Sequence, residues 1–188
     1  MKRIVIMAVI SLSICLSVFS QENKNGWFAN LQTQTGDSIR LYLISNISVA
    51  YTKQFNNVAK AAGPLTKSDD EIFKVAELYK APEKDSIETV VLVNFPNGDG
   101  SWSKALSWGV KNNLRITDPH LVFAIAEKFP KLNWKPPFGS WTYLIETTGC
   151  TFNESRQMCC VLFNGLDRAS LLLYQKAGQK NTWFAFRK

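Results

Sequence analysis

Alternating hydrophobic and polar positions predict a β-hairpin near the start of the chain. Within residues 27 to 45, apolar or β-branched side chains recur at every second position on either side of Thr35, Gly36 and Asp37. A period of two is typical of strands with one buried face, and turn-forming residues between two such runs favour antiparallel pairing. We therefore expect two strands joined by a turn at these three residues.

Two helical patterns follow the hairpin. The first should begin at Ser48, whose hydroxyl can cap it, and stop at Gly63 and Pro64. Its apolar positions, three or four residues apart, are Tyr51, Phe55, Val58 and Ala62. The second starts with the S-x-x-E capping-box form at Ser68 and ends before Pro82. Its apolar positions are Ile72, Val75, Ala76 and Tyr79.

A strand and another helix are expected in the middle of the chain. The segment SIETVVLVNF, residues 86 to 95, predicts a central strand, because residues 90 to 93 are all apolar and both faces should be covered. Asp118 followed by Pro119 is typical of a helix start, and Pro130 closes the apolar stripe that follows.

The segment between them, residues 101 to 113, fits strand alternation and one helical face equally well. Ser101 as an N-cap and the pair Asn112 and Asn113 as a left-handed stop favour a helix.

The last part of the chain predicts strands joined in hairpins. Strands are expected over residues 141 to 147, 158 to 163, 170 to 174 and 182 to 186. Asn164 and Gly165 form a strong hairpin signal between the second and the third. Helices clustered between hairpins predict an α+β fold: a mostly antiparallel sheet with helices packed on one side.

The N-terminal segment predicts that the protein is exported from the cytoplasm. Lys2 and Arg3 precede the uncharged, mostly apolar run 4 to 19, and the small residue Ser20 follows, which is typical of a secretory signal peptide cleaved before Gln21. The run is too short and too near the terminus for a membrane anchor, so no stable membrane span is expected after cleavage. We expect a single domain over residues 21 to 188 in the periplasm or outside the cell.

The charge distribution argues against a nucleic-acid partner. The formal net charge is +7, and Lys2 and Arg3 account for two of these charges. The remaining basic residues are scattered among acidic neighbours and form no Lys/Arg block. A nucleic-acid-binding chain is expected to gather its positive charges on one face.

Three cysteines, Cys150, Cys159 and Cys160, lie close together in the sequence. Neighbours on a strand point to opposite faces, and the one histidine is distant in sequence, so we expect no metal and no cofactor. An oxidising compartment instead favours a disulfide between Cys150 and either Cys159 or Cys160, with a weak preference for Cys159. The leftover thiol is either a small buried apolar group or forms an intermolecular bond.

His120 and a group of aromatic residues are the remaining candidates for a site. His120 falls in the first turn of the Asp118 helix, where we expect a neutral surface ring and only a weak catalytic candidate. Trp134, Phe138 and Trp141 flank a Pro-Pro pair in a stretch that must be partly loop. These rings either form an exposed surface for a sugar or a peptide, or cap the open end of the sheet as core.

The absence of a catalytic motif favours a non-enzymatic, exported binding module that recognises a protein or a glycan, possible types being an inhibitor or an immunity protein. One alternative is a small secreted hydrolase that uses His120 with a cysteine or a carboxylate. The other is an envelope component held at the membrane by an uncleaved signal.

Overall fold

The computed structural model describes residues 21–23, 26–32, 38–67, 69–98, 100–134, 138, 142–152, 157–174 and 180–188. For residues 21–32, 142, 150 and 151 the description covers the backbone alone. The predicted signal peptide, residues 1 to 20, lies outside the described residues.

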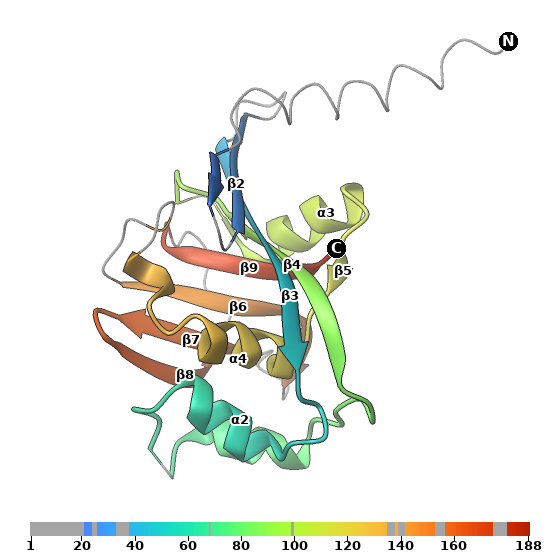
Figure 1. Ribbon diagram of the computed structural model, residues 1–188, viewed down its shortest axis with the longest axis vertical. Coiled ribbons are helices and arrows are strands. Elements are labelled where there is room, and N and C mark those ends of the chain that lie inside the picture. The colour runs from blue at the N-terminus through green and yellow to red at the C-terminus, as the bar shows by residue number, and fades with distance from the viewer. Residues whose placement is uncertain are drawn as a thin grey trace, which may run out of the picture.

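In the described part of the chain, nine strands form one sheet (Figure 1). Eight of them follow the order β1-β2-β3-β4-β9-β6-β7-β8, and β5 pairs with β9. The bounds are β1 Gln21–Asn23, β2 Gly26–Gln32, β3 Ser38–Val49, β4 Ser86–Asn94, β5 Arg115–Ile116, β6 Thr142–Phe152, β7 Gln157–Asn164, β8 Asp167–Tyr174 and β9 Thr182–Arg187. Described neighbours pair antiparallel except β6 and β9. The predicted α+β class with a mostly antiparallel sheet is confirmed.

The strand pairs of the two predicted hairpins are present, and the turn expected at Thr35, Gly36 and Asp37 lies outside the described residues. β2 and β3 pair antiparallel, with Leu31 opposite Ile39. β7 and β8 pair antiparallel up to Asn164 opposite Asp167, and Gly165 in the turn has a φ of 61°. A residue without a Cβ adopts this left-handed conformation at little cost, which is why the Asn-Gly pair predicted the turn correctly.

β4 is a central strand of the sheet, as its apolar run predicts. Its side chains pack into two separate hydrophobic cores, one on each face of the sheet. Val90 and Leu92 join the larger core cluster, whereas Val91 and Val93 join a smaller cluster on the opposite face. The sheet therefore has a covered surface on both sides of β4.

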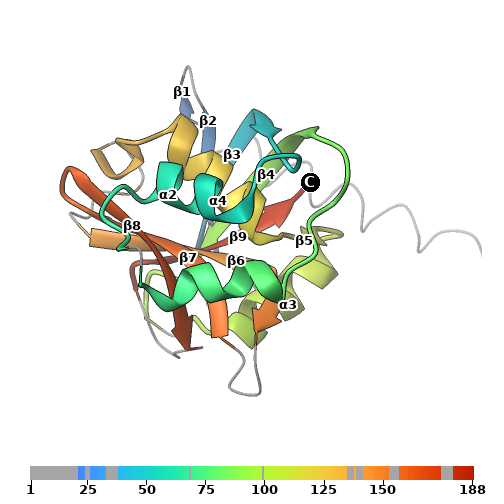
Figure 2. The same ribbon diagram turned by 90° about the horizontal axis from the view of Figure 1, so that it is seen from below.

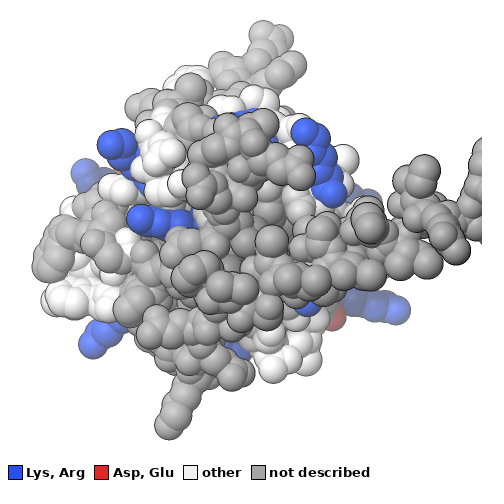
Figure 3. Space-filling model, turned by 90° about the horizontal axis from the view of Figure 1, so that it is seen from above, with Lys and Arg blue, Asp and Glu red and all other residues white. Residues whose placement is uncertain are grey.

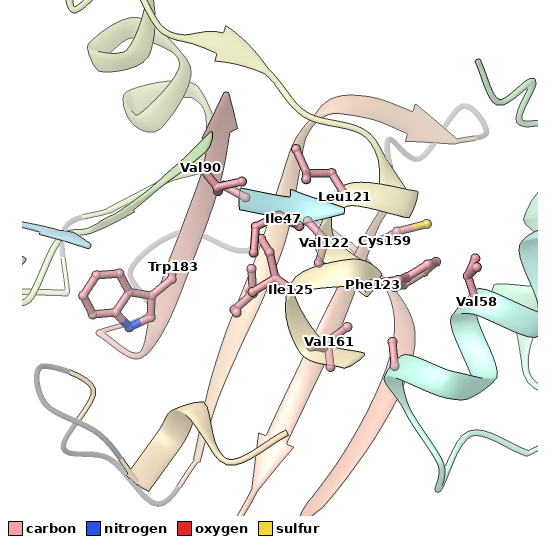
Figure 4. Close-up of a cluster of buried hydrophobic side chains, with 14 of the residues drawn as sticks. Ile47, Val58, Val90, Leu121, Val122, Phe123, Ile125, Cys159, Val161 and Trp183 are labelled. Atoms are coloured by element: carbon pink, nitrogen blue, oxygen red, sulfur yellow. The ribbon is translucent and has the colours of Figure 1, made fainter. Parts of the chain in front are cut away.

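The larger core lies between the sheet and the helices α2 (Phe55–Ala62) and α4 (Pro119–Lys128), which lie side by side (Figure 2). Figure 4 shows α4 side chains such as Val122 and Ile125 among Ile47 of β3 and Val161 of β7. The predicted cap of α4 is confirmed, because Asp118 Oδ1 accepts a hydrogen bond from the Leu121 amide at 3.1 Å.

The ambiguous segment after β4 is the helix α3 (Trp102–Lys111), as the capping signals favoured. Ser101 Oγ accepts a hydrogen bond from the Lys104 amide at 3.1 Å, and Asn113 has a φ of 57°. α3 packs on the face opposite α2 and α4, where a Cβ on Gly109 would lie 2.8 Å from Phe186 Cζ. The prediction of helices packed on one side of the sheet therefore holds for α2 and α4. The helix α3 covers a smaller area of the other face.

The predicted start of the first helix is wrong. Ser48 and Val49 belong to β3, where they pair with Ile87 and Ser86 of β4, and α2 begins only at Phe55. Pairing with a strand far away in the sequence overrides the local helical spacing, which is too weak to hold a helix without its own core contacts.

The second predicted helix is a 3₁₀ helix, η1 (Glu71–Glu77), rather than an α-helix. Ser68 lies outside the described residues, so its capping box is not tested. Ile72 and Val75 are buried as predicted, but Ala76 is exposed. A period of three residues places Ile72 and Val75 on one face and turns the next position outward.

The edge strand β8 is covered by the segment that follows α2. The Leu65 amide donates to the Arg168 carbonyl at 3.0 Å, and Thr66 Oγ1 accepts from the Ser170 amide at 2.8 Å. Gly63 makes this approach possible, because a Cβ there would fall on Ser170 N and lie 2.6 Å from Ala169 C. Covering an edge in this way removes a template for pairing with another chain.

Gly63→Ala should therefore destabilise the protein by about 1 to 3 kcal/mol, since the obstructing atoms are backbone and cannot rotate away. Urea unfolding followed by circular dichroism measures the effect. Leu65→Ala, at an exposed neighbouring position, serves as the control and should change the free energy of unfolding by no more than about 0.5 kcal/mol. Equal stability of the Gly63→Ala variant and the unsubstituted protein would contradict the close approach.

Candidate functional site

His120 lies in the first turn of α4 as predicted, but it is buried rather than on the surface, with 2% of its area exposed. The turn after β3, the start of α2 and the segment that follows η1 each place an aromatic ring next to it. The ring centroids of Tyr51, Phe55 and Tyr79 lie 5.4, 5.9 and 5.5 Å from that of His120. No local pattern in the sequence predicts this group of rings around His120, because the rings come from separate segments of the chain.

The hydrogen bond between His120 and the Lys53 carbonyl determines the tautomer of the ring. Nε2 lies 3.3 Å from the Lys53 carbonyl oxygen, which can only accept, so Nε2 carries the proton and Nδ1 is an acceptor. Nδ1 is buried and has no hydrogen-bond partner among the described residues. Burial lowers the pKa of His120, so the ring is neutral at pH 7.

The carboxylate nearest to His120 in the sequence, that of Asp118, is occupied by structural hydrogen bonds. Its Oδ2 accepts from the Tyr51 hydroxyl at 2.8 Å and from the guanidinium of Arg187. Arg187 Nε also lies 3.7 Å from Glu88 Oε1. Burial, followed by the negative charge of Asp118, raises the pKa of Tyr51, which keeps the phenol protonated as a donor.

A shallow cavity of about 350 Å³ borders His120. It opens where the end of β3, the helix α2 and the helix α4 meet, and its lining consists of Ser48, Ala50, Lys53, Val58, His120, Ala124, Glu127 and Lys128. Neither a cysteine nor a carboxylate hydrogen-bonds the imidazole within the described residues. The hydrolase alternative needs a cysteine or a carboxylate next to His120, and among the described residues neither is hydrogen-bonded to the ring.

The cysteines lie on opposite faces of β7, as strand parity predicted. Cys159 joins the core beneath α2 and α4, and Cys160 pairs with Glu146 of β6 on the other face. The structure contains no disulfide among the residues that it describes, and the Cys150 side chain lies outside them, so the disulfide stays a prediction. Over the same residues no group of three His, Cys, Asp or Glu side chains is placed to hold a metal ion.

Glu146 is a buried carboxyl that the sequence did not single out. The strand register places it in one cross-strand row with Val93, Phe184, Cys160 and Leu171. The side chains around this carboxyl are therefore apolar or weakly polar, and burial raises its pKa to about 7. A glutamate in a strand carries no sign of its own burial, since the face it occupies is equally often exposed.

The three aromatic residues that the sequence offers as a binding surface differ in their exposure. Trp134, at the end of the 3₁₀ helix η2 (Leu132–Trp134), is 53% exposed. Phe138 is 4% exposed and stacks on Tyr143 at 5.1 Å, so the expectation of an exposed ring is wrong for it and the alternative of a core ring holds. Trp141 lies outside the described residues.

The turn between β7 and β8 holds Trp134 in place. Trp134 Nε1 donates to the Gly165 carbonyl at 3.1 Å, and Asn133 Nδ2 donates to the same oxygen at 2.5 Å. Figure 1 shows the η2 turn beside the connected ends of these strands. Leu166 in the turn is 70% exposed, and Leu65, bonded through its amide to β8, is 58% exposed. We call Leu65, Trp134 and Leu166 the hairpin-tip surface.

Positive charges do not merge on the part of the upper face that is described. Figure 3 shows lysine and arginine side chains standing apart from one another around its rim. Among the described helices, none combines the length and the apolar composition that a bilayer crossing needs.

Comparison of the chain with protein-family models, with curated proteins and with solved structures finds no significant match. The candidate sites therefore rest on their geometry.

Glu146→Gln should stabilise the protein at neutral pH. The folded-state pKa of about 7 exceeds the ordinary value of 4.5, so this group's contribution is fully present below pH 4.5 and is lost as the pH rises to about 7 and above. The difference corresponds to about 3 kcal/mol in favour of the variant at pH 8. Urea unfolding of both proteins between pH 4 and pH 8 measures it.

Glu83→Gln, at an exposed position, is the control and should shift stability little at any pH. A stability difference between the Glu146→Gln variant and the unsubstituted protein that stays constant between pH 4 and pH 8 would contradict a raised pKa.

Proposed function

We propose that this protein is an exported, non-enzymatic binding module that recognises a partner protein through the hairpin-tip surface. The observation that carries the proposal is the exposed ring of Trp134, whose Nε1 donates to the carbonyl of Gly165, the residue that precedes the exposed Leu166 in the β7–β8 turn. An inhibitor or an immunity-type protein is the kind of module that such a surface fits.

The orientation of Trp134 supports binding because the ring is fixed before a partner arrives. Asn133 and Trp134 donate to one carbonyl oxygen, so η2 and the β7–β8 turn are locked together. A fixed aromatic side chain loses little conformational entropy on association, and tryptophan is enriched among the residues that dominate interface energies.

The neighbours of Trp134 favour a protein over a glycan. Sugar rings stack on aromatic faces and need convergent polar side chains, whereas Leu65 and Leu166 offer exposed aliphatic groups. Aliphatic side chains beside a tryptophan suit a partner with an apolar cluster of its own.

The charged residues near the hairpin-tip surface indicate which residues should surround the apolar cluster of the partner. Lys67 and Lys131, close in sequence to Leu65 and Trp134, are exposed, and Asp167 is an exposed carboxylate beside Leu166. The exposed Asp69 and the half-buried Asp70, whose Oδ2 accepts from the Lys67 amide, add carboxylates close to Lys67, so a partner with both signs of charge around its apolar centre is expected. Such rim charges mainly steer association and make its rate depend on salt.

The binding test starts from the partner captured and identified with the mature protein, residues 21 to 188, as bait. With the purified partner, Trp134→Ala should weaken affinity at least about 30-fold, as expected for the loss of a central hot spot of about 2 kcal/mol. Leu166→Ala should weaken it about tenfold, and 0.5 M salt should slow association.

Leu78→Ala, at a residue that is 67% exposed at the end of η1, is the matched control and should bind normally. Equal affinity of the Trp134→Ala and Leu78→Ala variants would refute the hairpin-tip surface. Loss of binding after enzymatic deglycosylation of the partner would show that a glycan is recognised instead.

Export is tested separately by the mass of the natural protein. A secreted or periplasmic chain should begin at Gln21 and remain in the soluble extract after cell fractionation. An intact chain that begins at Met1 and sediments with membranes would contradict cleavage and would favour the envelope alternative.

A further inference from the structure

We infer that the layer over His120 is a pH-sensitive cover, which opens when the imidazole takes up a second proton and then uncovers the edge of β8. We define the α2 cover as residues 51–67 and 69–79, which contain the turn after β3, the helix α2 and the helix η1. The α2 cover contacts α4 on one side and β8 on the other, and Figure 2 shows α2 beside α4.

The contacts that bury the imidazole come from the α2 cover, whereas His120 itself belongs to α4. Nε2 lies 3.3 Å from the carbonyl oxygen of Lys53. The rings of Tyr51, Phe55 and Tyr79 pack against the imidazole at centroid distances of 5.4, 5.9 and 5.5 Å. The ring has almost no contact with water while the cover is closed, and it gains that contact when the cover moves away from α4.

The closed cover leaves no acceptor for a second proton on the ring. Nε2 already donates to the Lys53 carbonyl, so the added proton goes to Nδ1 of His120, which is buried and has no hydrogen-bond partner among the described residues. A buried donor without an acceptor is unfavourable, and here it also carries part of a positive charge. Opening the cover lets water accept from this N–H, so protonation favours the open form.

The two carboxylates that attract a proton to the ring are held by other donors. Asp118, the N-cap of α4, accepts from Arg187 and from the Tyr51 hydroxyl. Asp85, which precedes β4, accepts from the amide and the hydroxyl of Thr52 at 2.9 and 3.0 Å. Burial outweighs the attraction of both carboxylates, so the pKa of His120 stays below its ordinary value.

The remaining polar groups around the ring do not favour a buried imidazolium. Tyr51 and Tyr79 face it as uncharged phenols. Lys53, Glu127 and Lys128 line the shallow cavity beside it. The two ammonium groups repel a further positive charge, and the Glu127 carboxylate also interacts favourably with the guanidinium of Arg168.

The same cover protects the edge of β8. The Leu65 amide donates to the Arg168 carbonyl at 3.0 Å, and Thr66 Oγ1 accepts from the Ser170 amide at 2.8 Å. Ser170 Oγ donates to the Ala59 carbonyl at 2.7 Å. α2 links these contacts to the imidazole, because it carries both a ring that packs on the imidazole and the carbonyl that binds β8. A cover that leaves α4 therefore frees backbone groups of β8 that a partner strand can pair with.

The cover should be closed at neutral pH and open in mild acid. Because burial places the pKa of His120 below its ordinary value of 6.5, closure keeps its full stability above pH 6.5 and loses it as the pH falls toward the lowered pKa. At pH 5 the open form should gain at most about 30-fold, the limit that a freely titrating imidazole sets.

Amide hydrogen exchange followed by NMR tests the cover on the unsubstituted mature protein. The protection factors of the Leu65 and Ser170 amides, whose hydrogen bonds join the cover to β8, should fall about 5- to 30-fold between about pH 7.5 and about pH 5. The amides of β4 should remain more protected than these two at the lower pH, which distinguishes opening of the cover from global unfolding.

His120→Gln keeps an N–H donor for the Lys53 carbonyl but does not titrate, so both protection factors should change less than about twofold over the same pH range. Glu146→Gln is the matched control, because the pKa of Glu146, about 7, lies in that range. Glu146 shares its cross-strand row with Phe184, on the face of the sheet away from the cover, so this variant should show the full loss of protection.

Constant protection of the Leu65 and Ser170 amides in the unsubstituted protein would overturn the inference, whether or not a variant folds. An equal loss of protection in the His120→Gln variant and the unsubstituted protein would overturn it as well. Both results are read on the protein alone, so neither bears on the partner-binding proposal. Normal partner affinity of the Trp134→Ala variant would refute that proposal and leave the cover standing.

Discussion

The carboxylate of Asp118 joins three parts of the fold, and the arrangement around His120 depends on it. It caps α4 through the Leu121 amide, and it accepts from Tyr51 in the turn after β3 and from Arg187 at the end of β9. A buried carboxylate is stable only when such donors satisfy it, so the three elements cannot separate without leaving a charge unpaired. The position of His120, two residues further on, follows from this junction.

A pair of threonine side chains extends the junction to the far side of β9. The Thr117 amide donates to Thr148 Oγ1 at 3.0 Å, the Thr148 amide donates to Thr117 Oγ1 at 3.2 Å, and both hydroxyls donate to the Ala185 carbonyl. This buried exchange fixes the irregular part of β6, where the register shifts between Glu146 and Thr151.

Local signals predicted several of the elements, whereas the burial of single side chains depended on contacts between distant segments. Asp118 with its following proline and the Asn164-Gly165 turn act within four residues, so the sequence alone placed α4 and the β7–β8 hairpin. The burial of His120 depends on Tyr51, which lies in a segment whose path is set by the pairing of β3 with β4. Phe138 is likewise buried by partners from β3, β6 and β9, and no spacing near it carries that information.

Two carboxyl groups that are buried among the described residues differ in how their charge is balanced. Asp118 is paired with Arg187, so removing the guanidinium leaves a buried carboxylate without its opposite charge. Glu146 has neighbours such as Phe184 and Cys160 that offer no positive charge, and it responds by holding its proton to a higher pH. A buried carboxyl with no cationic partner costs free energy once it ionises, so Glu146 departs from the pairing that Asp118 follows. Its burial comes from the pairing of β6 with β7 and β9, which no local pattern around Glu146 encodes.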